Sequence, residues 1–378
     1  MPNPILQFGT SRFLQAHVDL FVSEALAGVD GAGSALGGIT MVQTTASADS
    51  AARIAALTSG GGYPVRVRGL VAGERVDRLV TCTAIHSALQ AGTDWPQIRH
   101  TLVHDVKVVV SNTADRGYQL DAGDGPALLA ADQPAPASFP AKLLVLLHDR
   151  WQQRPDAPLT LLPCELIERN GTVLRDLVVS LARSWQLTQA FVQWLQQHCV
   201  WANSLVDRIV SEAIQPVGAV AEPYALWAIE RQPGLQLPCT HPAIVLTDDL
   251  DQHERLKLFL LNAGHSYLVE RWQALGRPAD QLVREAMADP EQRAELEALW
   301  AEEIVPVLAQ LGQGAQAEAY LVSLRERLEN PFLQHRLADI AQNHAQKKQR
   351  RLGPVVALAR TLGMTLPQPR LQAALPQA

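Results

Sequence analysis

The first half of the chain alternates between short apolar segments and segments with helical periodicity. The apolar segments at residues 4–8, 39–42, 106–110 and 159–162 are typical of buried strands, and residues 141–153 have the spacing of a helix. Strands that alternate with helices indicate a parallel sheet that is covered on both faces. The pattern therefore predicts an α/β domain in this part of the chain.

A different pattern interrupts this alternation. Apolar and polar residues alternate at residues 63–68 and again at residues 75–83, on either side of Gly73. A period of two is the signal of strands with one buried face, and a glycine between two such runs favours a turn. We therefore expect a β-hairpin that is inserted in the sheet domain.

Beyond about residue 201 the strand signals largely stop and helical periodicity dominates. Asp-Pro at 289–290, with glutamine two residues later, predicts a helix start, and Asn-Pro at 330–331 predicts another. The tail at residues 367–378 is expected to be frayed.

This change of pattern predicts a boundary near residue 200. We expect an α/β domain at residues 1–200 and a mostly α-helical domain at residues 201–378.

Composition narrows the class of protein. The 378 residues are 47% hydrophobic and 19% charged, which is ordinary for a globular protein of two or three domains. The net charge of −6 argues against a nucleic-acid-binding surface. No apolar run approaches the ~20 residues that span a bilayer, and the N-terminus lacks the features of a signal peptide.

The four cysteines, at positions 82, 164, 199 and 239, are far apart and form no C-x-x-C pair. This spacing argues against a disulfide framework and against a structural zinc site. We therefore expect a soluble, reduced, cytoplasmic protein.

The turn after the first predicted strand is a candidate cofactor site. It includes Phe8, Gly9, Ser11, Arg12 and Phe13, and it leads into a segment with helical spacing. In an open parallel sheet, such a turn can present backbone N–H groups to a phosphate. It has one glycine in place of the three of G-x-G-x-x-G, so a purely structural turn is the alternative.

A second candidate lies where the strand at residues 106–110 ends. Ser111, Asn112 and Thr113 are small polar residues that could line the nicotinamide ribose. An ordinary Asx turn explains them equally well.

The end of the second strand bears on the choice of cofactor. In NAD-binding domains this position carries an acid for the adenosine ribose, but here residues 43–45 are Gln-Thr-Thr. We expect NAD, because nothing basic lies nearby, and NADP stays open.

The segment at residues 256–268 carries the most informative polar residues. It has helical length and an apolar background, yet it contains Lys257, Asn262 and His265. At about 100° per residue, Asn262 lies about 140° and His265 about 80° around the helix from Lys257, so all three share one side.

This trio fits acid–base chemistry. Burial lowers the pKa of a lysine towards that of a general base. An asparagine amide can donate to an alkoxide or carbonyl oxygen, and a histidine can bond the same oxygen or a neighbouring hydroxyl. The alternative is that the lysine of this segment reaches solvent and the histidine is an ordinary core residue.

A further segment lies at the expected domain boundary. Asn203 is a candidate second donor to the reacting oxygen. Asp207 and Arg208 are either substrate contacts or a structural ion pair.

These residues resemble a known family. The spacing of Lys257, Asn262 and His265, preceded by NSLVDRI at 203–209, is similar to the signature of the polyol-specific long-chain dehydrogenases, the mannitol dehydrogenase family. Within it, the chain looks like the tagaturonate reductase (altronate oxidoreductase) branch. The segments that carry this second resemblance are ILQFGTSRFLQA (5–16), VSNT (110–113), LPCELIERNG (162–171), EPYALW (222–227) and RLENPF (327–332).

The resemblance implies a Rossmann-like N-terminal domain, a helical C-terminal domain and a metal-free site in the cleft between them. It also implies roles for four residues. Lys257 would take the hydroxyl proton as general base while hydride passes to the nicotinamide. Asn203 and Asn262 would hold the reacting oxygen, and His265 would orient the substrate.

Three features depart from the family pattern. Ser11 stands in place of a second glycine, the acid for the ribose is missing, and the chain is short, approaching the length of mannitol-1-phosphate 5-dehydrogenases. A basic run at 346–351 is either a solvated helix end or, if it folds over the site, a group in which Lys347 and Lys348 bind a substrate carboxylate or phosphate.

We therefore expect an NAD(P)-dependent oxidoreductase of a sugar acid or polyol, nearest to tagaturonate/altronate interconversion, that acts as a monomer. The alternatives are a sugar-phosphate dehydrogenase and a catalytically silent protein that binds nucleotide or sugar. No nucleic-acid or membrane partner is expected.

Overall fold

The computed structural model describes residues 3–29, 31–44, 48–113 and 117–375, and for residues 48–51 it describes the backbone alone. Residue 45, at the end of the second predicted strand, lies outside the described ranges. The chain divides into two compact units. Unit 1 comprises Met1–Arg66, Leu79–Ala221 and Ala225–Leu250, and unit 2 comprises Val67–Arg78, Glu222–Tyr224 and Asp251–Ala378.

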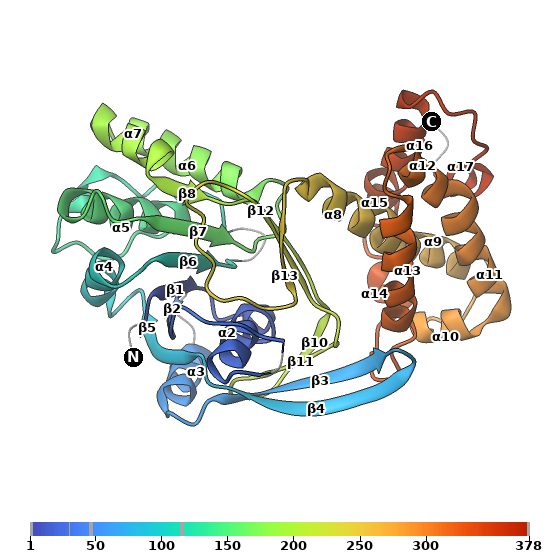
Figure 1. Ribbon diagram of the computed structural model, residues 1–378, viewed down its shortest axis with the longest axis horizontal. Helices are drawn as coiled ribbons and strands as arrows, with labels where there is room; N and C mark the ends of the chain where they lie inside the picture. The colour runs from blue at the N-terminus through green and yellow to red at the C-terminus, as the bar shows by residue number, and fades with distance from the viewer. Residues whose placement is uncertain (1–2, 30, 45–47, 114–116, 376–378) are drawn as a thin grey trace. The chain divides into compact units, whose positions relative to one another are not determined.

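Within the described residues, unit 1 contains a sheet of six parallel strands (Figure 1). The strands are β1 (Ile5–Phe8), β2 (Ile39–Gln43), β5 (Ile85–Gln90), β6 (Val108–Ser111), β7 (Leu159–Pro163) and β8 (Cys199–Trp201). They lie in the order β5-β2-β1-β6-β7-β8. Numbered within this sheet, that is the order 3-2-1-4-5-6 of dinucleotide-binding Rossmann domains. The predicted α/β domain is confirmed.

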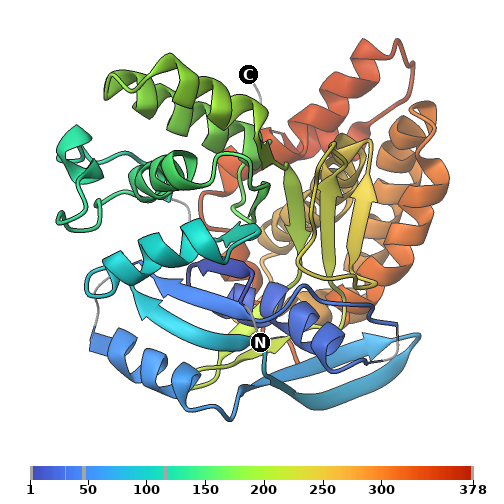
Figure 2. The ribbon, with the colours of Figure 1, turned by 60° about the vertical axis from the view of Figure 1, so that its left-hand side comes forward.

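Helices bury the apolar side chains of this sheet. Four helices lie along this sheet (Figure 2), namely α4 (Trp95–His104), α5 (Phe139–Gln153), α6 (Asn170–Ser184) and α7 (Gln189–Gln197). They share one core cluster with strand residues such as Leu6, Phe8 and Leu161. The remaining helices of this unit are α1 (Arg12–Gln15), α2 (Val18–Leu26), α3 (Ala48–Thr58) and the 3₁₀-helix η1 (Pro126–Leu129).

The sequence pattern located β1, β2, β6 and β7 but not β5 or β8. Strand β8 is three residues long, and β5 mixes His86, Ser87 and Gln90 with apolar residues. Neither strand therefore contains the apolar run by which the others were recognised.

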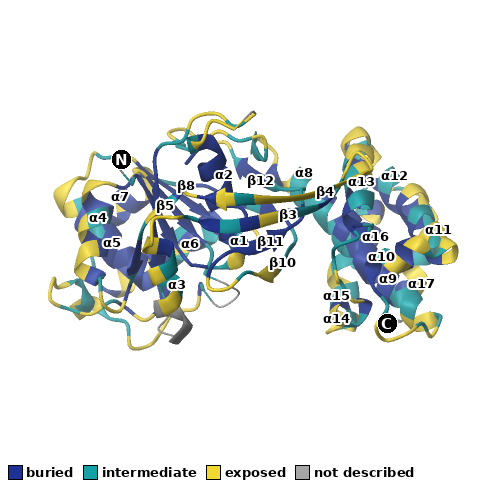
Figure 3. Ribbon diagram, turned by 90° about the horizontal axis from the view of Figure 1, so that it is seen from below, coloured by how far each residue is buried: buried dark blue, intermediate teal, exposed yellow. Residues whose placement is uncertain are grey.

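The predicted hairpin is confirmed as β3 (Tyr63–Val71) and β4 (Glu74–Cys82). Ala72 and Gly73 between them have φ of +51° and +80°, and two positive φ values are those of a type I′ hairpin turn. The hairpin joins a sheet of order β10-β11-β3-β4, with β10 at Val210–Ala213 and β11 at Ala219–Ala221. Strand β4 is its outer strand and is exposed along most of its length (Figure 3).

Several strands follow residue 200, where the sequence indicated few. Besides β10 and β11, the strands β9 (Ser204–Asp207), β12 (Leu226–Glu230) and β13 (Ile244–Thr247) form a sheet of order β13-β12-β9. Each has three to five residues, which is too short for a period to be recognised. Unit 1 therefore continues to Leu250, whereas the pattern placed a boundary near residue 200.

The described part of unit 2 is mostly helical, as expected, and its apolar side chains share a core. Its helices are α8 (Leu250–Leu256), η2 (Lys257–Asn262), α9 (Ala263–Ala274), α10 (Val283–Ala288), α11 (Pro290–Ala298), η3 (Leu299–Ile304), α12 (Val305–Gln310), α13 (Gly314–Leu328), α14 (Leu337–Ile340), α15 (His344–Arg351), α16 (Gly353–Thr361) and α17 (Pro369–Ala374). Of these, η2 and η3 are π-helical. None of the described helices is long and apolar enough to cross a membrane.

The helix start predicted at 289–290 is confirmed, because Oδ1 of Asp289 accepts the backbone N–H groups of Glu291 and Gln292 at 3.0 and 3.2 Å. The helix predicted from Asn330-Pro331 is wrong. The carbonyl of His335 accepts the N–H of Val283 at 2.9 Å, and Leu282 forms an antiparallel bridge with Arg336. These bonds keep the chain extended, so the helix begins only at α14.

The expectation of a frayed tail is wrong for α17. The carboxylate of Glu303 accepts the backbone N–H groups of Arg370 and Leu371, both at 2.9 Å. Leu371 is fully buried in the core of unit 2. A buried acid and an apolar anchor therefore fix this segment, while residues 376–378 lie outside the described ranges.

Candidate active site

Gly9 lies at the carboxyl end of β1, between β2 and β6. Its φ is +112°, and a Cβ at this position would lie 2.5 Å from the carbonyl oxygen of Asn112, so only glycine fits. The strand order reverses between β1 and β6, which is where open α/β sheets bind their ligands. The residues present therefore fit a dinucleotide whose phosphates approach this backbone.

Ser11 links the two candidate cofactor segments. Its Oγ donates to Oδ1 of Asn112 at 3.2 Å and accepts the N–H of Leu14 at 3.3 Å. Nδ2 of Asn112 donates to the carbonyl of Cys164 at 2.8 Å. The side chain of Asn112 thus ties the turn after β1 to the loop after β7, and the two segments lie side by side.

The other two residues of the first turn differ in their surroundings. Arg12 is exposed, and the ring of Phe13 stacks on His17 with centroids 4.7 Å apart. Burial lowers the pKa of His17 to about 3, so its imidazole is neutral. Phe13 therefore continues a buried aromatic layer, and Arg12 faces solvent.

Glu165 anchors the second segment. Its carboxylate accepts hydrogen bonds from Oγ of Ser111 at 3.0 Å, and from the N–H and Oγ1 of Thr113 at 3.0 and 2.9 Å. Burial raises the pKa of Glu165, and the bonds from Thr113 and Ser111 oppose that rise. The sequence analysis gave Glu165 no role, although it lies within the segment 162–171 that carried part of the resemblance.

Side chains also meet where β1 and β2 end. Oγ1 of Thr10 donates to Oε1 of Gln43 at 2.7 Å, and Nη1 of Arg53 donates to Oγ1 of Thr10 at 3.2 Å. Arg53 belongs to α3, ten residues beyond the end of β2. Inspection of the strand end in the sequence therefore missed a basic group that the fold brings there.

Asn203 is buried between β8 and β9, and its amide is bonded at both ends. Oδ1 accepts the N–H of Thr172 at 2.9 Å, and Nδ2 donates to Oε2 of Glu230 at 2.7 Å. Because an amide nitrogen carries two hydrogens, the bond to Glu230 leaves a second hydrogen on Nδ2. Asp207 and Arg208 are also buried, and Arg208 donates to the carbonyl of Ala16.

The three polar residues of the predicted helix 256–268 lie in unit 2, at a break in helical geometry. Lys257 and Asn262 are the first and last residues of the π-helix η2. The backbone hydrogen bonds of a π-helix join residue i to residue i+5, which brings these two residues to the same side of the helix, closer than the ~140° of a regular α-helix. Both are half-buried, whereas His265 is buried.

A tryptophan from the second π-helix supports this turn. The indole N–H of Trp300, in η3, donates to the carbonyl of Leu260 at 3.1 Å. A Cβ on Gly264 would lie 3.0 Å from Cζ2 of Trp300, so the glycine lets the indole lie against the helix. The sequence analysis missed Trp300, because it lies 40 residues beyond the carbonyl that it bonds.

His265 has an aromatic neighbour from the extended segment before α14. The rings of His265 and His335 meet edge to face, with centroids 5.0 Å apart and an angle of 75° between their planes. Burial lowers the pKa of His335, which keeps this ring neutral at pH 7. His265 is thus fixed on one side by an uncharged group.

The basic run at 346–351 forms part of α15, which packs along α9. Nζ of Lys348 pairs with Oε2 of Glu270 at 2.7 Å, and Nη1 of Arg351 donates to Oγ of Ser266 at 3.2 Å. Nζ of Lys347 donates to the carbonyl of Ile340 at 2.8 Å. The run therefore lies against the helix that continues from η2.

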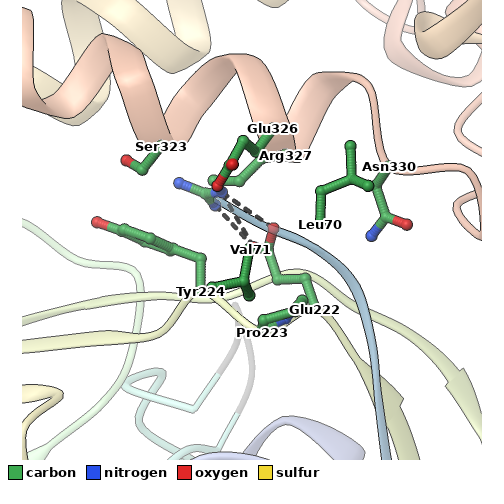
Figure 4. A pocket seen from close by; sticks show the side chains of 9 residues that line it. All are labelled: Leu70, Val71, Glu222, Pro223, Tyr224, Ser323, Glu326, Arg327 and Asn330. Atoms are coloured by element: carbon green, nitrogen blue, oxygen red, sulfur yellow. Dashed lines mark hydrogen bonds and ion pairs between the residues drawn. The ribbon is translucent and has the colours of Figure 1, made fainter. Parts of the chain in front are cut away.

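Unit 2 also contains a pocket of about 230 Å³ between the hairpin tip, residues 222–224 and α13 (Figure 4). Two of its lining residues, Arg327 and Glu222, form an ion pair of 2.9 Å, and their side chains are 3% and 2% exposed. The guanidinium carbon lies 4.2 Å from the ring centroid of Tyr224. Because the two charges neutralise each other in the interior, we interpret the pair as a structural element.

The described residues show no group of three or more His, Cys, Asp or Glu side chains that could hold a metal ion. All four cysteines are buried thiols.

Two family models match the chain. The mannitol dehydrogenase Rossmann domain matches residues 3–238, and the mannitol dehydrogenase C-terminal domain matches residues 249–368. Among curated relatives, an altronate oxidoreductase of Halalkalibacterium halodurans is 31% identical over 94% of this chain and 70% of its own length. An altronate oxidoreductase of Bacillus subtilis is 30% identical over 92% of this chain and 73% of its own.

Solved structures share the fold. A D-sorbitol dehydrogenase in substrate-free form has a TM-score of 0.79 at 21% identity, and covers 96% of this chain and 77% of its own. The mannitol 2-dehydrogenase of Pseudomonas fluorescens, in a ternary complex with NAD and D-mannitol, has a TM-score of 0.71 at 19% identity, with coverage of 99% and 78%.

Proposed function

The chain belongs to the mannitol dehydrogenase family, and on that premise we propose that it is an NAD-dependent dehydrogenase of a sugar acid, of the altronate/tagaturonate type, with Lys257 as general base. The observation that carries the proposal is the π-helical turn with Lys257 and Asn262 at its ends, since such turns are frequent at functional sites. The Rossmann sheet with its glycine-only turn supports the cofactor, and the altronate oxidoreductases support the substrate class.

Three residues of η2 and α9 have separate roles in the proposed reaction. NAD, when bound, supplies the acceptor of the hydride. Lys257 takes the proton of the reacting hydroxyl on Nζ as general base. Asn262 donates an amide hydrogen to the same oxygen as its charge develops, in the manner of an oxyanion hole. His265 donates to a neighbouring hydroxyl and so orients the sugar.

Residues of unit 1 maintain the conformation of the sheet edge at which the cofactor would bind. Gly9 leaves the backbone accessible, Ser11 and Asn112 join the two turns, and Glu165 fixes Ser111 and Thr113. Asn203 stays a predicted second donor to the reacting oxygen, through the amide hydrogen that its bond to Glu230 leaves. These roles are positioning and binding rather than proton transfer.

A sugar acid carries a carboxylate, for which the chain offers the predicted contacts Lys347 and Lys348. The charge of Lys348 is already matched by Glu270, whereas Lys347 bonds a neutral carbonyl. We therefore assign the carboxylate contact to Lys347 first. Asp207 and Arg208 remain predicted substrate contacts, with Arg208 already bonded to a backbone carbonyl.

The test is a substrate panel read by the absorbance of reduced nicotinamide. We expect oxidation of altronate to exceed that of mannitol and of mannitol 1-phosphate. A preference for the phosphate would favour the sugar-phosphate dehydrogenase instead. Cofactor binding without turnover of any panel member would favour a silent binding protein.

The role of the lysine is tested separately. Lys257→Ala should lower kcat by about 10²- to 10⁴-fold, the usual contribution of a general base, and should leave NADH binding unchanged. The matched control is Lys107→Ala, which removes an exposed lysine of unit 1 and should keep full turnover. Undiminished turnover in Lys257→Ala would exclude this lysine as the base.

A further inference from the structure

Arg53 lies at the edge of the Rossmann sheet where β1 and β2 end. Its Nη1 donates to Oγ1 of Thr10 at 3.2 Å, and Thr10 in turn donates to Oε1 of Gln43 at 2.7 Å. Thr10 directly follows Gly9, and Gln43 is the last residue of β2. The chain of hydrogen bonds therefore fixes a guanidinium group at the carboxyl ends of two neighbouring strands.

This edge is where Rossmann domains distinguish their two cofactors. A carboxylate at the end of the second strand bonds the 2′-hydroxyl of NAD, and an arginine nearby accommodates the 2′-phosphate of NADP. Here the end of β2 carries the neutral amide of Gln43, and that amide is engaged by Thr10. Among the side chains that the structure describes, Arg53 bonds a neutral hydroxyl, so its positive charge is not cancelled by that bond.

We propose that Arg53 forms a 2′-phosphate subsite, so that the protein accepts NADP as well as NAD. The proposal rests on the proposed function, because it needs the dinucleotide site of unit 1. Guanidinium groups bind phosphates through charge-assisted, bidentate hydrogen bonds. Thr10 keeps the guanidinium in place, and the neutral side chain of Gln43 lies where a carboxylate would repel the phosphate.

The decisive probe pair is adenosine 2′,5′-bisphosphate and adenosine 5′-monophosphate, which differ in the 2′-phosphate. Isothermal titration needs no substrate and no turnover. We expect the wild-type protein to bind the bisphosphate more tightly than the monophosphate. Arg53→Gln should weaken the bisphosphate by about 10- to 100-fold, the range for a lost hydrogen bond to a charged group, and should change the monophosphate little.

Two variants sharpen the assignment. Arg53→Lys keeps the charge but lacks the planar fork, so we expect an affinity for the bisphosphate between those of wild type and Arg53→Gln. The matched control is Arg175→Gln, which removes the same charge from α6, where Arg175 pairs with Asp176 at 2.9 Å. This control should leave both affinities unchanged. The ratio of kcat/KM for NADP to that for NAD should fall in Arg53→Gln and not in the control.

Several outcomes would overturn the inference. Equal binding of the two probes by the wild type would show that no 2′-phosphate subsite exists. An equal loss of both probes in Arg53→Gln would show that Arg53 contacts the adenine or supports the fold. Failure of both probes to bind would overturn the dinucleotide site itself, and with it the proposed function. Binding of the bisphosphate without sugar-acid oxidation would uphold the subsite and contradict the proposed substrate.

Discussion

Replacement of Trp300 by phenylalanine tests whether the π-helical turn matters for catalysis. The change keeps an aromatic ring in the core but removes the indole N–H that bonds the carbonyl of Leu260 at 3.1 Å. Trp300 is 1% exposed and Leu260 is fully buried, so the carbonyl would be left without that bond in the interior. The carbonyl still accepts the backbone N–H of Ala263, so the loss of this one hydrogen bond costs about 0.5–1.5 kcal/mol, and the lost ring volume adds to this.

The expected catalytic effect follows from the geometry of η2. If the turn relaxes to a regular α-helix, Asn262 moves from the side of Lys257 to a position about 140° away. Misplacement of a catalytic group by about 1 Å can cost about 10²-fold in rate. We therefore expect Trp300→Phe to lower kcat by about 10²-fold, to change the pH profile of kcat, and to leave the Kd of NADH unchanged.

The control is a second tryptophan of the same unit. The indole N–H of Trp272, in α9, donates to the carbonyl of Pro278 at 2.8 Å. Trp272→Phe removes the same kind of bond without touching η2. Stopped-flow and steady-state kinetics would be compared with urea unfolding for both variants. If Trp300→Phe lost stability but kept the kcat and pH profile of the control, the turn would have no catalytic role.

Three further changes test other parts of the structure. Gly9→Ala should weaken NADH binding by at least about tenfold, because its Cβ would lie 2.5 Å from the carbonyl oxygen of Asn112, in the loop that follows β6. An unchanged Kd in a fluorescence titration would contradict this. Burial raises the pKa of Asp19 from 3.8 to about 7. Between about pH 4 and 7 the folded state therefore keeps a proton on this carboxyl group that the unfolded state releases. The free energy of unfolding should fall by about 4 kcal/mol as the pH rises through this range. In Asp19→Asn the urea-unfolding free energy should lack that fall, and a variant with the wild-type pH dependence would exclude Asp19 as its source. Glu222→Gln removes the carboxylate that pairs with the buried guanidinium of Arg327 and should cost about 3–5 kcal/mol. Glu326→Gln, at a surface contact with the hairpin, should cost less than 1 kcal/mol. Equal unfolding free energies of the two variants would mean that the buried pair contributes little.

The sequence predicted those parts of the fold that local pattern determines. Strands β1, β2, β6 and β7 are mostly apolar segments, and the hairpin has a period of two around a glycine. Strands of three to five residues after Trp201 left no such signal, and the helix expected from Asn330 was prevented by backbone bonds to a distant segment. Local patterns therefore sufficed except where long-range pairing decides the conformation.

The candidate site, like the fold, could be predicted from the sequence only in part. Lys257, Asn262 and His265 could be found because polar residues stand out in an apolar helix. Their mutual arrangement could not, because an α-helix was the default and the π-helical turn coincides with a tertiary contact to Trp300. Arg53 was missed for a related reason, since its position at the end of β2 depends on how α3 returns to the sheet.

The division of the chain into units has a consequence for recombination between relatives. The backbone passes from one unit to the other five times, so residues 67–78 and 222–224 belong with the C-terminal unit although they precede residue 250. A chimera joined at residue 250 would inherit Glu222 from one parent and Arg327 from the other. Exchange of substrate preference by grafting the C-terminal portion will therefore preserve stability only if those two short insertions travel with it.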